Sequence, residues 1–176
     1  MRAVVRAIEW LVDRSGQAAA LIALAIIGLM VSNVILRYTM SAGSMWAQEL
    51  EWHLLAALVL LGMSYSLQRG ENVRVDIFYS RFSAASKKAV DIVSAVLTIV
   101  LGCLVIWLSL KYVGQSFAIN EKSADPGGLP YRWALKSLIP LGYGLLVLQA
   151  LGQLLRIIGG WEVHAEAGEG DPARHV

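Results

Sequence analysis

The chain has 176 residues, of which 57% are hydrophobic and 16% are charged, with a formal net charge of +2. A soluble domain is nearer half apolar and a quarter charged, so this composition favours a membrane protein. No block of like charges indicates a nucleic-acid partner, and the single cysteine, Cys103, excludes an internal disulfide and a cysteine-built metal site.

An amphipathic helix is expected over residues 1–16. Apolar side chains recur at helical spacing within 2–14, most charged side chains lie on other faces, and Trp10 is typical of an interfacial residue. This pattern predicts a helix that lies on the cytoplasmic membrane surface or against a partner subunit, since one apolar stripe suits both.

Four apolar runs are long enough to cross a hydrocarbon core of about 30 Å, which needs roughly 20 helical residues. They cover residues 18–37, 46–67, 89–111 and 135–157. The first run is longer than the apolar part of a signal peptide, so we expect it to remain as a span. The sequence therefore predicts an all-α membrane protein with a four-helix transmembrane domain over 17–158 and a polar tail over 159–176.

The basic residues predict the orientation of these spans. If the N-terminus is cytoplasmic, ten of the 15 Lys and Arg residues fall on inside segments and five on outside segments. The positive-inside rule then places both termini in the cytoplasm.

Charged side chains gather where the first two spans approach each other. Arg37 closes the first span, and Glu49, Glu51 and His53 follow Trp46 at the start of the second. We expect an Arg37–carboxylate pair to fasten this hairpin at the outer interface. The alternative is that these are solvated helix-end charges, with the carboxylates favoured by the helix dipole. A direct role in binding a transported solute is the least favoured interpretation.

Polar and small residues inside the spans indicate helix packing. Asn33, Gln149 and Gln153 can form hydrogen bonds to neighbouring helices. Small residues that allow close approach are Gly28, Gly62 with Ser66, Gly102, and Gly142 with Gly144.

Two loops carry unusual patterns. In the inner loop, Gly70 is expected to stop the second helix, and apolar residues then alternate with Arg74 and Asp76, which predicts a segment in the headgroup zone or against another chain. The outer loop, "NEKSADPGGLPYRW", is expected to be a tight turn. Its charged residues make it a candidate docking surface: Glu121, Lys122 and Asp125.

Several functional classes are disfavoured. A haem anchor needs paired axial ligands, and only His53 lies near a span, because His164 and His175 are in the tail. No metal-ligand cluster, Ser–His–Asp set or phosphate-binding glycine loop is recognisable. A self-sufficient transporter usually shows internal repeats and charge at the midplane, and neither is found. We therefore expect an accessory or scaffold subunit of a larger membrane assembly, without its own cofactor.

The segment "LRYTMSAGSMWAQELEWHLLAALVLLGMSYSLQRGENVRVD" resembles the small membrane subunit of the tripartite ATP-independent periplasmic (TRAP) transporters. The later "DPGGLPYRWALKSLIPLGYGLLVLQAL" resembles the region that enters the fourth helix of that family. One departure is Glu71-Asn72, where many members have a His. The residues that carry the pattern are Arg37-Tyr38, Trp46, Glu49, Gly62, Arg69-Gly70 and Asp76.

The resemblance implies a mechanism divided among three components. A periplasmic binding protein delivers an organic anion, and a large membrane subunit binds this substrate and sodium ions and moves them. The small subunit is implied to brace the large one in the bacterial inner membrane and to offer part of the dock for the binding protein. The alternatives are a membrane anchor of an electron-transfer complex and a free-standing membrane protein.

Overall fold

The computed structural model describes residues 2–40, 43–70 and 82–160. Within these residues it contains four helices and no strand: α1 (Arg2–Met40), α2 (Met45–Arg69), α4 (Ala84–Ala118) and α5 (Arg132–Gly159). Each helix is long and apolar enough to cross a membrane. The predicted all-α fold with four spans is thus confirmed. The expected interfacial segment around Asp76 and the tail beyond Gly160 lie outside the described residues.

Residues 2–14 are helical as expected, but they do not form a separate element. They are the first turns of α1, which continues without a break for 39 residues. Ser15 and Gly16 both lie within the helix: the Ser15 hydroxyl donates to the Val12 carbonyl at 2.8 Å, and Gly16 lies against the Tyr65 ring. At 1.5 Å per residue α1 is about 58 Å long. It must therefore tilt steeply or extend beyond the hydrocarbon.

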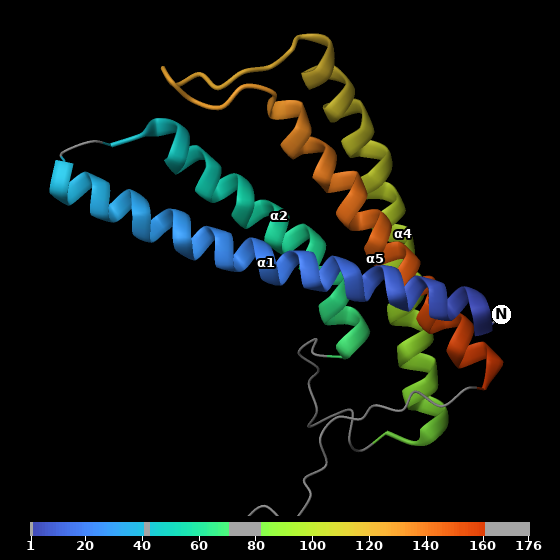
Figure 1. Ribbon diagram of the computed structural model, residues 1–176. Helices are drawn as coiled ribbons and strands as arrows, with labels where there is room; N and C mark the ends of the chain where they lie inside the picture. The colour runs from blue at the N-terminus through green and yellow to red at the C-terminus, as the bar shows by residue number, and fades with distance from the viewer. Residues whose placement is uncertain (1, 41–42, 71–81, 161–176) are drawn as a thin grey trace, which may run out of the picture.

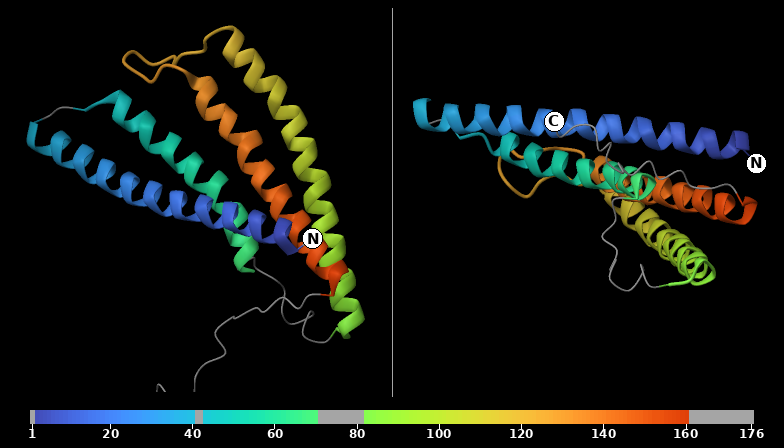
Figure 2. Two further views of the ribbon diagram at one scale, coloured as in Figure 1. Left: turned by 45° about the vertical axis from the view of Figure 1, so that its right-hand side comes forward. Right: turned by 90° about the horizontal axis from the view of Figure 1, so that it is seen from below.

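The helices form two hairpins, α1–α2 and α4–α5, which meet through α2 and α5 (Figure 1). The hairpins diverge toward the end that carries the α4–α5 connection, which we call the loop end. At the opposite end, the crossing end, the N-terminal half of α1 passes over α5 (Figures 1 and 2).

Local sequence signals explain where the helices begin and end. The Ser44 hydroxyl accepts a hydrogen bond from the Ala47 N–H at 3.3 Å and caps α2. Gly70 ends α2 with a left-handed φ of 70°, as the sequence predicts. The Ser83 hydroxyl caps α4 in the same way through the Ser86 N–H, at 3.2 Å.

Glycines mark the closest helix contacts. A Cβ on Gly142 of α5 would lie 2.6 Å from the Leu60 carbonyl oxygen of α2, and one on Gly102 of α4 would lie 2.4 Å from Val147 of α5. Both glycines belong to the set expected to pack closely. Among the others in that set, Gly62 makes only an ordinary contact and Gly28 and Gly144 face open space. In a membrane, where the hydrophobic effect does not drive helices together, small residues allow the backbones to approach and pack closely.

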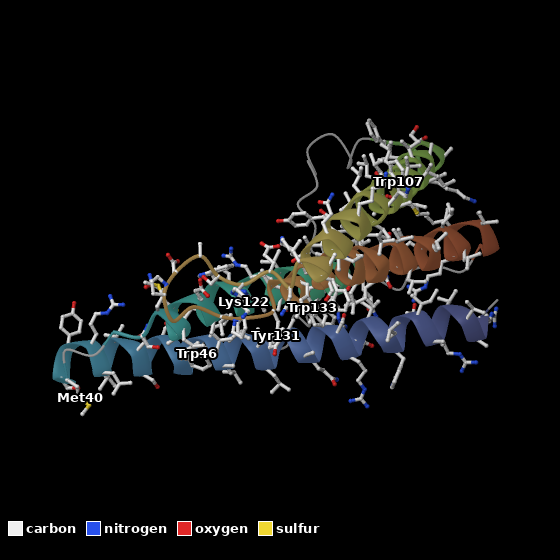
Figure 3. The ribbon with its side chains drawn as sticks, turned by 90° about the horizontal axis from the view of Figure 1, so that it is seen from above. Met40, Trp46, Trp107, Lys122, Tyr131 and Trp133 are labelled. Carbon is white, nitrogen blue, oxygen red and sulfur yellow. The ribbon has the colours of Figure 1, made fainter. Side chains whose placement is uncertain are left out.

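Large apolar side chains remain exposed along the flanks of α1 and α4. Figure 3 shows one of them, Trp107, on the side of α4 that faces away from α1. Apolar exposure on this scale indicates contact with lipid or with another membrane protein. The flank of α1 consists of Leu21, Leu24, Ile27, Val31 and Val34, and that of α4 of Val93, Val100, Leu101, Leu104 and Trp107.

Candidate functional site

The loop between α4 and α5, residues 119–131, has a defined backbone. The Ser123 N–H donates to the Leu129 carbonyl at 3.2 Å, and the Arg132 N–H donates to the Glu121 carbonyl at 3.1 Å. Between them, Gly127 adopts a φ of 80°, which glycine tolerates without strain. These bonds make the loop the tight turn that the sequence predicts.

Glu49 connects α2 to this loop. Glu49 is only 3% exposed. One carboxylate oxygen accepts a hydrogen bond from the Ser123 hydroxyl and the other accepts one from the Leu129 N–H. A buried carboxylate is costly unless hydrogen bonds of this kind compensate it. The contact therefore joins the first turns of α2 to a loop more than 70 residues later.

An ion pair between Glu121 and Lys136 joins the loop to α5. The Lys136 ammonium also lies 3.9 Å from the centroid of the Tyr112 ring, a cation–π contact. The hydrogen bond from Lys136 lowers the pKa of the Glu121 carboxyl. Of the three residues expected on the docking surface, Glu121 thus faces inward, whereas Lys122 and Asp125 are exposed (Figure 3 labels Lys122).

The α1–α2 hairpin is fastened differently from the sequence expectation. Glu51 accepts a hydrogen bond from the Asn33 side-chain amide at 3.1 Å. Arg37 is exposed and, among the described residues, makes no ion pair with Glu49 or Glu51. Asn33 is better placed because it is buried against α2, while Arg37 lies one turn further along α1. The side chain of α1 that fastens this hairpin is therefore the Asn33 amide rather than the Arg37 guanidinium.

Two further residues named from the sequence lie nearby on α2. His53 Nδ1 is 2.6 Å from the Glu49 carbonyl oxygen, and its ring lies 4.0 Å from that of Trp52, centroid to centroid. Trp46 is exposed in the first turn of α2, close to the loop end (Figure 3). This position suits an aromatic residue at a membrane interface.

A cavity of about 310 Å³ opens between α2 and the α4–α5 hairpin at the loop end. Its walls are mainly apolar, and the Arg132 guanidinium at its edge lies 5.7 Å from the Trp52 ring centroid. The contact between Gly142 and Leu60 lies one helical turn beyond its last α5 residue, Ile139. The cavity follows from the divergence of the two hairpins.

A second polar cluster lies at the crossing end. Glu9 of α1 forms an ion pair with Arg156 of α5. Asp13 of α1 accepts a hydrogen bond from the Gln68 amide at 3.3 Å and lies 3.5 Å from the Arg69 guanidinium. We define the crossing-end cluster as these residues together with Gln153, whose side chain donates to the Leu67 carbonyl at 3.1 Å.

Sequence reasoning missed most of the crossing-end cluster. It placed Glu9 and Asp13 on a surface helix, apart from the spans. The helical period that continues from residue 2 into the first span is the signal that could have located them. In the described parts of the chain, no group of three or more His, Cys, Asp or Glu could hold a metal ion.

The comparisons with known proteins identify the family. Residues 26–160 match the family described as "Tripartite ATP-independent periplasmic transporters, DctQ component". The comparison with curated proteins gives no match. The matched region includes residues 26–40 of α1, all of α2, α4 and α5, and the loop over 119–131. This is a family of transporter components rather than of enzymes, so an electron-transfer anchor is not supported. The chain belongs to the DctQ family and is the small membrane subunit of a TRAP transporter.

Proposed function

We propose that this subunit braces the large membrane subunit during sodium-coupled uptake of an organic acid delivered by a periplasmic binding protein. The observation that carries this proposal is the distribution of charge. No Asp, Glu, Lys or Arg occurs within residues 15–36, 54–68, 92–110 or 137–155, so the middle of every span is uncharged. Substrate and sodium sites are therefore expected in the large subunit.

The apolar flanks of α1 and α4 support the bracing role. Both present long rows of exposed aliphatic side chains, and the polar contacts of the bundle are concentrated toward its two ends. A surface of this kind suits contact with a neighbouring helix bundle as well as with lipid.

Photo-crosslinking tests which flank meets the large subunit. A photoreactive residue is introduced at Leu24 on α1 or at Leu101 on α4, with the two membrane subunits expressed together. At least one position is expected to crosslink to the large subunit. If neither does, and the small subunit is equally monodisperse in detergent with and without its partner, the bracing proposal is overturned.

The proposed orientation has the loop end in the periplasm and both termini in the cytoplasm. It is supported by the distribution of Lys and Arg. Exposed Lys122 and Asp125 would then face the binding protein. In a Cys103→Ser background, a membrane-impermeant maleimide added to intact cells with a permeable outer membrane should label Lys122→Cys but not Arg2→Cys. Labelling of Arg2→Cys but not of Lys122→Cys would show the opposite orientation and overturn this proposal.

A further inference from the structure

At the loop end, the buried carboxylate of Glu49 is a group that the bracing role does not use. Glu49 belongs to α2, yet its carboxylate accepts hydrogen bonds from two residues of the α4–α5 loop, Ser123 and Leu129. These two residues lie on either side of the turn at 125–128. The neighbouring carboxylate, Glu51, accepts a hydrogen bond from Asn33 of α1 instead. Two carboxylates two residues apart on one helix thus hold different parts of the molecule.

The contacts of Glu49 determine where the exposed charges of the loop lie. Lys122 directly precedes Ser123, and the Asp125 N–H donates to the Ser123 hydroxyl at 3.2 Å. A shift of Ser123 would therefore move both exposed residues. Opposite charges at fixed positions are suited to orient a charged partner during encounter.

The loop backbone is seated closely on the carboxylate. A Cβ on Gly128 would lie 2.7 Å from Glu49 Oε2 and 2.5 Å from the Ser123 hydroxyl oxygen. Only a residue without a side chain fits between them unless the loop moves. The position of the loop thus depends on both the charge of Glu49 and the absence of a side chain at Gly128.

We propose that Glu49 is a positioning residue for binding-protein docking, which it supports by holding loop 119–131 in its docking conformation. This inference rests on the proposed docking role of Lys122 and Asp125. Glu49 itself is buried and does not touch the partner. It acts through Ser123 and Leu129.

The test uses the complete transporter in proteoliposomes, with its own binding protein added at varied concentrations. In Glu49→Gln the amide oxygen can accept one of the two hydrogen bonds from the loop. The amide nitrogen replaces the other carboxylate oxygen and, being a donor, cannot accept the second bond. We expect the binding-protein concentration for half-maximal uptake to rise about tenfold, equivalent to about 1.4 kcal/mol. The uptake rate at saturating binding protein should not change.

Hydrogen exchange gives a readout that does not depend on docking. Amide exchange in a peptide covering 119–131 should increase in Glu49→Gln, while peptides from the middle of α2 and α5 keep their exchange rates. Ser123→Ala removes one of the same bonds from the loop side and should act in the same direction. This second variant keeps the test valid if Glu49→Gln fails to assemble.

The matched control is Glu51→Gln, which loosens α1 but leaves the loop contacts intact, so it should alter neither loop exchange nor the half-maximal concentration. The double variant Lys122→Ala/Asp125→Ala separates the two proposals. If it shifts the half-maximal concentration and Glu49→Gln does not, the positioning role is overturned alone. If it too has no effect, the docking surface and the positioning role both fail.

Discussion

Glu9, in the third turn of α1, forms an ion pair with Arg156, in the last turn of α5, so the first and last described helices meet through opposite charges at the crossing end. The side chains are 23% and 25% exposed, respectively. Close by, Gly152 of α5 lies against Ile8 of α1. Both an ionic and an apolar contact therefore join the N-terminal half of α1 to α5.

Replacing Arg156 with Gln should weaken this attachment. Exposed ion pairs contribute up to about 1 kcal/mol, whereas breaking a buried pair costs about 3–5 kcal/mol. For this partly buried pair we expect a loss of about 1–3 kcal/mol, measured by thermal unfolding in detergent. Glu9→Gln/Arg156→Gln should cost less than the sum of the single changes. Arg6→Gln, at an exposed position of α1, is the control and should have little effect.

Gly142→Ala should push α2 and α5 apart. The added Cβ would meet the backbone of Leu60, which cannot move aside as a flexible side chain can. Overpacking of this kind typically costs about 1–3 kcal/mol. Gly144→Ala is the matched control, since nothing lies within 4 Å of that Cβ position. A lower unfolding temperature for Gly142→Ala alone is expected, and equal temperatures would contradict the close contact.

Asn33→Ala should destabilise the α1–α2 hairpin, while Arg37→Ala should not. Asn33 is 7% exposed and supplies the hydrogen bond to Glu51. Side-chain hydrogen bonds between membrane helices contribute about 0.6 kcal/mol on average and about 1.7 kcal/mol at most. We expect a loss of this size for Asn33→Ala in thermal unfolding. If Arg37→Ala lost more stability than Asn33→Ala, Arg37 rather than Asn33 would be the residue that fastens the hairpin.

The ion pair of Glu121 and Lys136 should make loop-end stability depend on pH. Because the hydrogen bond from Lys136 lowers the pKa of Glu121, the contribution of the pair is fully present above the ordinary pKa of a glutamate. It is lost as the pH falls through the lowered value. The measurement compares unfolding temperatures of the wild type and Lys136→Met across this range.

At neutral pH the wild type should be the more stable of these two proteins. Their difference should shrink on acidification, as Glu121 becomes protonated and the pair loses its charge. A difference that stays constant down to the most acidic pH would show that Lys136 acts by packing against Tyr112 rather than through Glu121.

The charged residues illustrate the limit of sequence reasoning. The sequence places Glu49 at the outer end of the second span, but it does not predict the partners Ser123 and Leu129, because a contact across more than 70 residues leaves no trace in local spacing. Arg37 was expected to pair with a carboxylate because unlike charges flank a short hairpin. The rotation of α1 about its axis decides otherwise, and it turns Asn33 toward Glu51.

The amino-acid sequence alone predicts a membrane protein, its four spans and the uncharged middle of each span, because these follow from hydropathy summed over about 20 residues. It also indicated Gly102 and Gly142 as packing positions. The three-dimensional arrangement was needed to show that α1 is one helix, that Glu9 and Asp13 join it to α5 and α2, and that Glu49 holds the 119–131 loop. These contacts depend on helix rotation and crossing angle, which are set by how small and large side chains fit together between neighbouring helices.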